Sequence, residues 1–98
     1  MSEVIDRFMR YISVDTMSAE DADQVPSTPG QMTLAGQLAD ELRSIGAQDV
    51  SLSEHGYVFA VIPATAGCEN APALGLIAHM DTSPAISGAD IHPQLVKD

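Results

Sequence analysis

The chain has 98 residues, of which 45% are apolar and 4% aromatic, and its formal net charge is −10. This length fits one small domain or one part of a larger one. The apolar fraction is ordinary for a globular chain, so intrinsic disorder is not the expected state. Because only four residues are basic, nucleic acids and anionic membrane surfaces are disfavoured as partners.

Leader, anchor and disulfide signals are all absent from the sequence. The N-terminus lacks the basic and apolar regions of a signal peptide, and no apolar run is long enough to span a bilayer. Cys68 is the single cysteine, so no intrachain disulfide can form. These features predict a soluble, cytoplasmic protein. Cys68 has neither a histidine nor basic residues nearby, which disfavours catalysis by its thiol.

The first helix is predicted over residues 2–12, where apolar residues recur at helical spacing. Ser2 suits the N-cap, and acidic residues in the first turn suit the positive end of the helix dipole. A polar, acidic connection follows, up to Ser27. It lacks the spacing and the closing glutamate of an EF-hand, so no calcium site is predicted there.

The second helix is predicted to begin after Thr28, with Pro29 at its first position and Gln31 completing a capping box. Gly46 supplies the stop, and Arg43 suits the last turn. One face carries the apolar residues that we expect in the core: Leu34, Ala35, Leu38, Leu42 and Ile45.

After the second helix the apolar period changes to two, which predicts strands at 50–53 and 57–62 joined by a tight turn. A third strand is predicted at 73–78, in the interior of the sheet because both of its faces are apolar. The fold class is therefore α/β, with two helices followed by a partial mixed sheet. Residues 91–96 could begin another strand, and an uncovered sheet edge would permit self-association.

The stretch that suggests chemistry is His79-Met80-Asp81, directly after the apolar run 73–78. A strand end can hold an imidazole at the rim of a sheet, where open α/β folds build their sites. In a metal site, His79 would bind zinc through one nitrogen. Asp81 would accept a hydrogen bond from the other nitrogen and fix the tautomer. The alternative is a purely structural histidine held by a loop aspartate.

The remaining candidates are weaker. His55 lies in the predicted hairpin turn, and His92 lies in the loop before Pro93. Thr82 and Ser83 follow His79, but a histidine that binds zinc is a poor general base for a nucleophile. Gly-rich phosphate loops and Cys-x-x-Cys pairs do not occur in the sequence.

Four blocks of the sequence resemble the N-terminal end of the peptidase T family, the tripeptide aminopeptidases of the M20 group of zinc peptidases. They are distributed from residue 7 to residue 96: 7–16 (RFMRYISVDT), 24–31 (QVPSTPGQ), 78–84 (AHMDTSP) and 87–96. The combination is specific to that family, whereas His-x-Asp-Thr alone indicates only the broader group. Ala85 departs from the family, whose members usually carry an acidic residue there.

The resemblance implies a zinc ligand at His79 and an orienting aspartate at Asp81. It implies that residues 1–98 form the N-terminal portion of a catalytic domain, without the family's lid domain. Two zinc ions and a small peptide substrate are expected for the complete enzyme. The remaining ligands and the general-base glutamate are expected beyond residue 98, so this chain alone is expected to be inactive. The alternatives are another M20 hydrolase (a dipeptidase or deacylase) or a truncated, non-enzymatic domain that self-associates.

Overall fold

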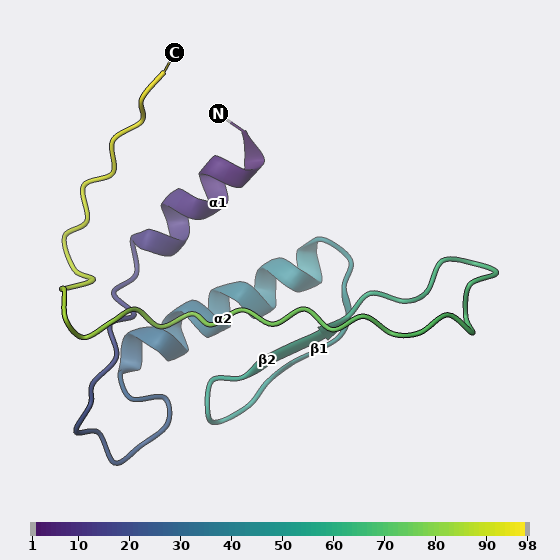
Figure 1. Ribbon diagram of the computed structural model, residues 1–98, viewed down its shortest axis with the longest axis horizontal. Helices are drawn as coiled ribbons and strands as arrows, with labels where there is room; N and C mark the ends of the chain where they lie inside the picture. The colour runs from purple at the N-terminus through teal and green to yellow at the C-terminus, as the bar shows by residue number, and fades with distance from the viewer. Residues whose placement is uncertain (1, 98) are drawn as a thin grey trace.

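The computed structural model describes residues 2–97, and the two terminal residues of the predicted 1–98 span lie outside the described part. Its elements follow the order α1 (Glu3–Ile12), α2 (Pro29–Ser44), β1 (Gln48–Leu52) and β2 (Val58–Val61). Figure 1 shows α1 above α2 and the hairpin below α2. The α/β class and the two predicted helices are confirmed.

Helix α1 begins as its sequence predicts. The Ser2 hydroxyl accepts a hydrogen bond from the amide of Ile5 at 3.3 Å, which satisfies one of the unpaired donors of the first turn. Glu3 and Asp6 lie in that turn, and Arg10 lies in the last, as the helix dipole favours. None of the α1 side chains is fully buried, so this helix depends on side-chain contacts with α2 for its position.

The predicted capping box at the start of α2 is wrong. Thr28 is the N-cap and Pro29 opens the helix, but the Thr28 side chain caps no backbone amide. Its hydroxyl instead donates to the carbonyl of Met17 at 2.9 Å. The side-chain amide of Gln31 donates hydrogen bonds to the hydroxyls of Ser27 and Thr28, at 3.0 and 3.1 Å. The Thr28-Pro29 pair therefore marks the start of the helix correctly, but the Thr28 hydroxyl forms its hydrogen bond with Met17, outside the helix.

The end of α2 matches its prediction. Gly46 adopts φ +90, its amide donates to the carbonyl of Arg43, and the amide of Ala47 donates to the carbonyl of Leu42. This pair of bonds is the Schellman arrangement, which favours glycine at the left-handed position. Ile45, expected in the core, is exposed because it lies at the C-cap, beyond the packed part of the helix.

The core of the described residues lies along α2. Leu34, Ala35 and Ala39 are its buried apolar side chains, and Gln31 is buried with them. The predicted face is thus correct near its centre, while Leu38 and Leu42 are half-buried. The hairpin packs against this helix.

Strands β1 and β2 form the predicted antiparallel hairpin, with Ser51 opposite Phe59. The register shifts near the start of β1, where Asp49 has φ 51 and forms a bulge. The tight turn lies where it was predicted: the Gly56 amide donates to Ser53, and Gly56 has φ +84.

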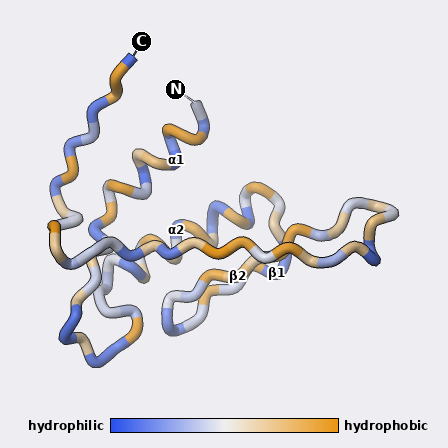
Figure 2. The backbone as a smooth tube through the Cα atoms, in the orientation of Figure 1, coloured by the Kyte–Doolittle hydropathy of each residue, from blue (hydrophilic) through white to orange (hydrophobic). Residues whose placement is uncertain are grey.

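The predicted third strand at 73–78 is wrong for this chain. The segment is extended, but no backbone hydrogen bond joins it to any other described residue. Leu76 is 87% exposed and Ile77 fully exposed. Figure 2 shows this apolar stretch crossing the molecule. Apolar residues alone do not make a strand, because each strand needs a neighbour for its amides and carbonyls. Residues 91–96 likewise form no strand.

The molecule exposes more surface than a compact protein of its mass. Its accessible area is 7753 Å², against about 5,400 Å² for a folded monomer of 10.3 kDa. Its radius of gyration is 16.1 Å, against about 13 Å for a compact domain of this length. Among the described residues, no helix is long and apolar enough to cross a membrane.

Candidate functional site

His79 and Asp81 lie together at the end of the extended segment. The Nδ1 atom of His79 is 2.9 Å from Oδ1 of Asp81 and 3.0 Å from its carbonyl oxygen. The His79 side chain is 85% exposed and that of Asp81 46%. The predicted pairing of these two residues is present, on a loop that is open to solvent.

This geometry assigns different tasks to the two imidazole nitrogens. A carboxylate accepts but does not donate, so the short contact is made by the tautomer with its proton on Nδ1. The lone pair then lies on Nε2, and no described group hydrogen-bonds to that atom. A histidine held in this way matches the usual form of a metal-binding imidazole with a carboxylate behind it.

The loop that carries the pair is attached to the N-terminal half by a parallel bridge between Met17 and Thr82. The amide of Thr82 donates to the carbonyl of Thr16 at 3.1 Å, and the amide of Ser18 donates to the carbonyl of Thr82 at 3.0 Å. The Ser18 hydroxyl donates to the same Thr82 carbonyl. Thr82 therefore fixes the loop immediately after Asp81.

The segment 15–18 that receives the loop is itself held tightly. Thr16 is buried, and the Asp15 carboxylate accepts a hydrogen bond from the amide of Met17 at 3.1 Å. Gly30 packs against this segment so closely that a β-carbon there would lie 1.7 Å from the carbonyl oxygen of Asp15. A side chain at Gly88 would meet the Asp15 carboxylate at 2.6 Å. Asp15 and Thr16 lie in the 7–16 block that resembles the peptidase family, which is the signal that could have identified them.

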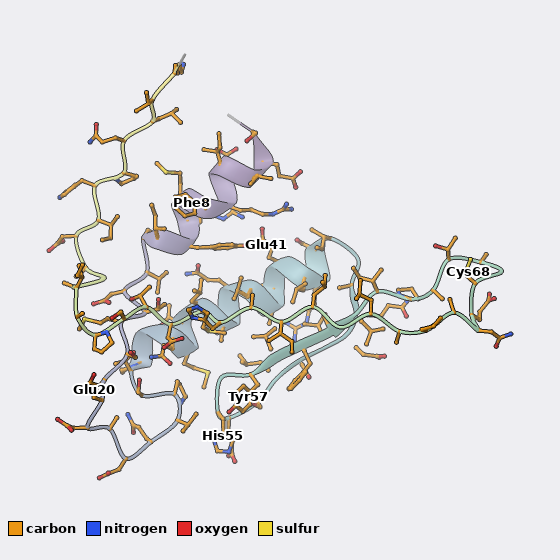
Figure 3. The ribbon with its side chains drawn as sticks, in the orientation of Figure 1. Phe8, Glu20, Glu41, His55, Tyr57 and Cys68 are labelled. Carbon is orange, nitrogen blue, oxygen red and sulfur yellow. The ribbon has the colours of Figure 1, made fainter. Side chains whose placement is uncertain are left out.

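The other sequence candidates lie apart from this pair. His55 lies in the hairpin turn beside Glu54, and Cys68 is an exposed thiol at the far end of a loop (Figure 3). His92 lies in irregular, exposed chain. The Ser83 hydroxyl accepts the amide of Ala85. Within residues 2–97, no group of three histidine, cysteine or acidic side chains gathers to hold a metal ion.

Glu41 forms a partly buried ionic cluster that the sequence patterns did not predict. Its side chain, 16% exposed, accepts hydrogen bonds from Arg7 at 2.5 Å, from Arg10 at 2.8 Å and from the hydroxyl of Tyr11. Figure 3 shows Glu41 on the face of α2 turned toward α1. The four residues attach α1 to α2. Because the partners lie on a different helix, helical spacing gave no signal for them.

The cluster shifts the pKa values of Glu41, Tyr11 and Arg7, and the hydrogen bond to Glu41 raises that of Arg7. The hydrogen bond from Tyr11 and the one from Arg7 lower the pKa of Glu41, although burial acts in the opposite direction. Burial, followed by the hydrogen bond and charge of Glu41, raises the pKa of Tyr11. The shifts of Glu41 and Tyr11 favour an ionised Glu41 beside a neutral Tyr11.

Together the fold and the site define an α/β segment that presents one histidine, oriented by a carboxylate, at the end of an extended run. No protein-family model matches the chain. It is similar over its whole length to curated proteins named peptidase T. The relative from Clostridium acetobutylicum is 49% identical over 98 residues, and those from Geobacillus sp. (strain WCH70) and Bacillus subtilis (strain 168) are each 45% identical, over 97 and 95 residues.

These matches cover 97–100% of this chain but only 23–24% of each relative. The chain therefore spans about a quarter of the length of the curated relatives it matches. It corresponds to the N-terminal portion of peptidase T, as the four sequence blocks predicted.

Proposed function

We propose that this chain supplies the first metal ligand of a zinc aminopeptidase that releases the N-terminal residue from tripeptides. The hydrogen bond between His79 Nδ1 and Asp81 Oδ1 carries the proposal, because it leaves Nε2 available on an exposed side chain. The similarity to proteins named peptidase T supports the peptidase class. A small peptide is the proposed substrate.

The proposed roles follow from the donor set. His79 binds the metal through Nε2, and Asp81 holds the proton on Nδ1 and the plane of the ring. Bound zinc would activate a water molecule and polarise the scissile carbonyl. Asp81 thus acts through His79, and its removal is expected to weaken metal binding rather than to abolish it.

The proposal also covers what the chain does alone. A catalytic zinc ordinarily has three protein ligands, and residues 2–97 contain no such cluster. We therefore infer that the isolated chain binds zinc weakly and does not hydrolyse peptides. Measurable tripeptide hydrolysis by the isolated, pure chain would overturn this inference. Sequencing the gene beyond the codon for Asp98 tests whether the rest of the site is encoded there. Codons for a bridging aspartate, a paired-carboxylate motif and a late histidine would supply the remaining metal ligands and the general base.

A substrate panel tests the proposed reaction. The complete product of the gene is assayed on a tripeptide, a dipeptide and an N-acyl amino acid, with and without the substitution His79→Ala. We expect tripeptide hydrolysis to dominate and to fall at least about a hundredfold in the variant, as the loss of a ligand implies. His55→Ala is the matched control and should retain activity. Preferred cleavage of the dipeptide or N-acyl substrate would instead indicate another M20 hydrolase.

A second candidate function is self-association without catalysis. The exposed run that includes Leu76 and Ile77 favours it, since contiguous apolar surface of this kind often marks an interface. Sedimentation equilibrium of the 98-residue chain tests this alternative. Concentration-dependent association that zinc does not change, in a gene product that cleaves none of the panel, would favour it over the peptidase.

A further inference from the structure

The candidate metal ligand is connected to α2 through hydrogen bonds that converge on the backbone of segment 15–18. The Thr28 hydroxyl donates to the carbonyl of Met17 at 2.9 Å. Met17 forms the parallel bridge with Thr82, which follows Asp81 directly. The bonds of Ser18 to the carbonyl of Thr82 close the other side of that bridge. Segment 15–18 is thus the described link between the helix and the loop.

We infer that Thr28 and Ser18 are positioning residues for His79: through segment 15–18 they fix the His79–Asp81 loop relative to α2. This inference extends the proposed function to residues that contact neither metal nor substrate. An N-cap threonine ordinarily bonds to an amide of its own helix, whereas Thr28 caps none and donates to Met17 instead. Its hydroxyl therefore stabilises the junction between the two segments rather than the helix terminus.

The closeness of the contacts supports this assignment. Gly30, two residues after Thr28, allows the Asp15 carbonyl to approach the helix backbone. Thr16, whose carbonyl accepts a hydrogen bond from the Thr82 amide, is buried, with an exposed fraction of 4%. By contrast, the apolar run before His79 has no backbone hydrogen bond to other described residues. The bridge at Thr82 is therefore the nearest fixed point to the imidazole, and its loss would free the whole loop.

Hydrogen exchange in the 98-residue chain tests the inference without requiring metal or activity. Thr28→Val keeps the branched shape and removes the donor, and Thr33→Val is the matched control. The Thr33 hydroxyl bonds only within its own helix, to Pro29 at 3.4 Å. We expect Thr28→Val to speed exchange of the Thr82 amide roughly two- to tenfold, the factor that one hydrogen bond supplies. Thr28→Ser should restore protection.

Three further readouts separate positioning from a general loss of stability. Exchange of the Ala35 amide in α2 should stay unchanged in Thr28→Val. The ¹⁵N shifts of the His79 ring, measured at one fixed pH, should move toward those of a free histidine. Ser18→Ala, which removes only the hydroxyl bond to Thr82, should give the same pattern more weakly. Unchanged Thr82 exchange in Thr28→Val, or equal acceleration at Ala35, would overturn the inference.

Kinetics of the complete gene product distinguish this inference from the proposed function. If both hold, Thr28→Val lowers kcat and leaves KM near its starting value, and Thr28→Ser recovers kcat. If the product hydrolyses no peptide while Thr82 responds as described, the proposed function fails and the positioning role stands. If hydrolysis is normal in Thr28→Val and Thr82 exchange is unchanged, the positioning role fails and the proposed function stands.

Discussion

The two parts of this chain differ sharply in how many of their backbone amides and carbonyls form hydrogen bonds within the protein. Residues 2–61 place their backbone groups in two helices, a hairpin and tight turns, and bury a small apolar core along α2. Residues 62–97 contain no helix or strand, and their long-range backbone hydrogen bonds all involve Thr82. The candidate metal ligand lies in the second part, beside the backbone bridge at Thr82 that attaches this part to the first.

This contrast explains the large surface of the molecule. The chain exposes about 2,400 Å² more than a compact monomer of its mass, and the run 73–78 includes some of its most exposed apolar side chains, Leu74, Leu76 and Ile77. A chain that spans about a quarter of its curated relatives carries the contacts for its helices and hairpin. Among residues 2–97, no backbone hydrogen bond pairs the apolar run with a neighbouring segment. The helices and the hairpin are therefore formed from contacts within residues 2–61, whereas the run 73–78 would need a partner strand to form a sheet.

The largest effect is expected from Gly30→Ala, which tests how the packed part is closed. The new methyl group would overlap the Asp15 carbonyl, so helix or loop must move. We expect a loss of about 3 kcal/mol or more, enough to remove most of the helical circular dichroism of a chain with so small a core. Gly36→Ala is the control on the same helix, with open space around it, and should gain about 0.5–1 kcal/mol. Equal effects of the two substitutions would contradict the close approach at Gly30.

A pair of identical substitutions tests the comparison between the two parts directly. Leu34 is 5% exposed, and truncation to alanine should lower the free energy of unfolding by about 2–3 kcal/mol. Leu76 is exposed, and truncation of its side chain to alanine should change the free energy of unfolding by less than about 0.5 kcal/mol. Urea denaturation followed by circular dichroism measures both. A large loss for Leu76→Ala would show that the apolar run is covered in solution.

A smaller loss than that of Leu34→Ala is expected from Glu41→Gln, which weakens the attachment of α1. The amide cannot form ion pairs with Arg7 and Arg10, and we expect a loss of about 1–2 kcal/mol at neutral pH. Glu54→Gln, on the exposed hairpin turn, is the matched control and should have little effect. Thermal unfolding of both variants at pH 7 measures the difference.

The same cluster predicts a pH dependence. Because the pKa of Glu41 is lower in the folded chain, its contribution is fully present above the unfolded value of about 4.3. The contribution is lost as the pH falls through the lower folded pKa. Stability curves from pH 7 to pH 2 should therefore be flatter in Glu41→Gln than in the wild-type chain. Parallel curves would show that Glu41 is not the titrating group.

The sequence correctly predicted the features that depend on neighbouring residues: the helix ends, the hairpin turn and the contact between His79 and Asp81. Pro29 marks the start of α2 and Gly46 marks its end, because proline fits the first helical turn and glycine the left-handed stop. Gly56 marks the hairpin turn for the same kind of reason. His79 and Asp81, two positions apart, form the contact that their spacing predicted.

Apart from Ile45, which is exposed at the C-cap of α2, the errors of the sequence-based predictions concern partners far along the chain. The run 73–78 has the composition of a buried strand, but strand formation depends on a neighbour that no local pattern contains. Thr28 looked like a capping residue, and its hydroxyl bonds instead to Met17, which lies 11 positions away. Glu41 meets Arg7 from 34 positions away, so no helical period revealed the pair. The sequence thus predicted the His79–Asp81 motif, but not the hydrogen bonds of Thr28 and segment 15–18 that hold its loop.

Zinc content of the complete gene product tests the central claim, that His79 is a metal ligand, most directly. Wild-type, His79→Ala and His55→Ala proteins are purified in parallel, dialysed against the same zinc solution and analysed for bound metal. The account predicts that His79→Ala retains clearly less zinc than the wild type, while His55→Ala retains the same amount. Equal zinc in all three proteins would show that His79 is not a ligand and would leave its bond to Asp81 with a structural role only.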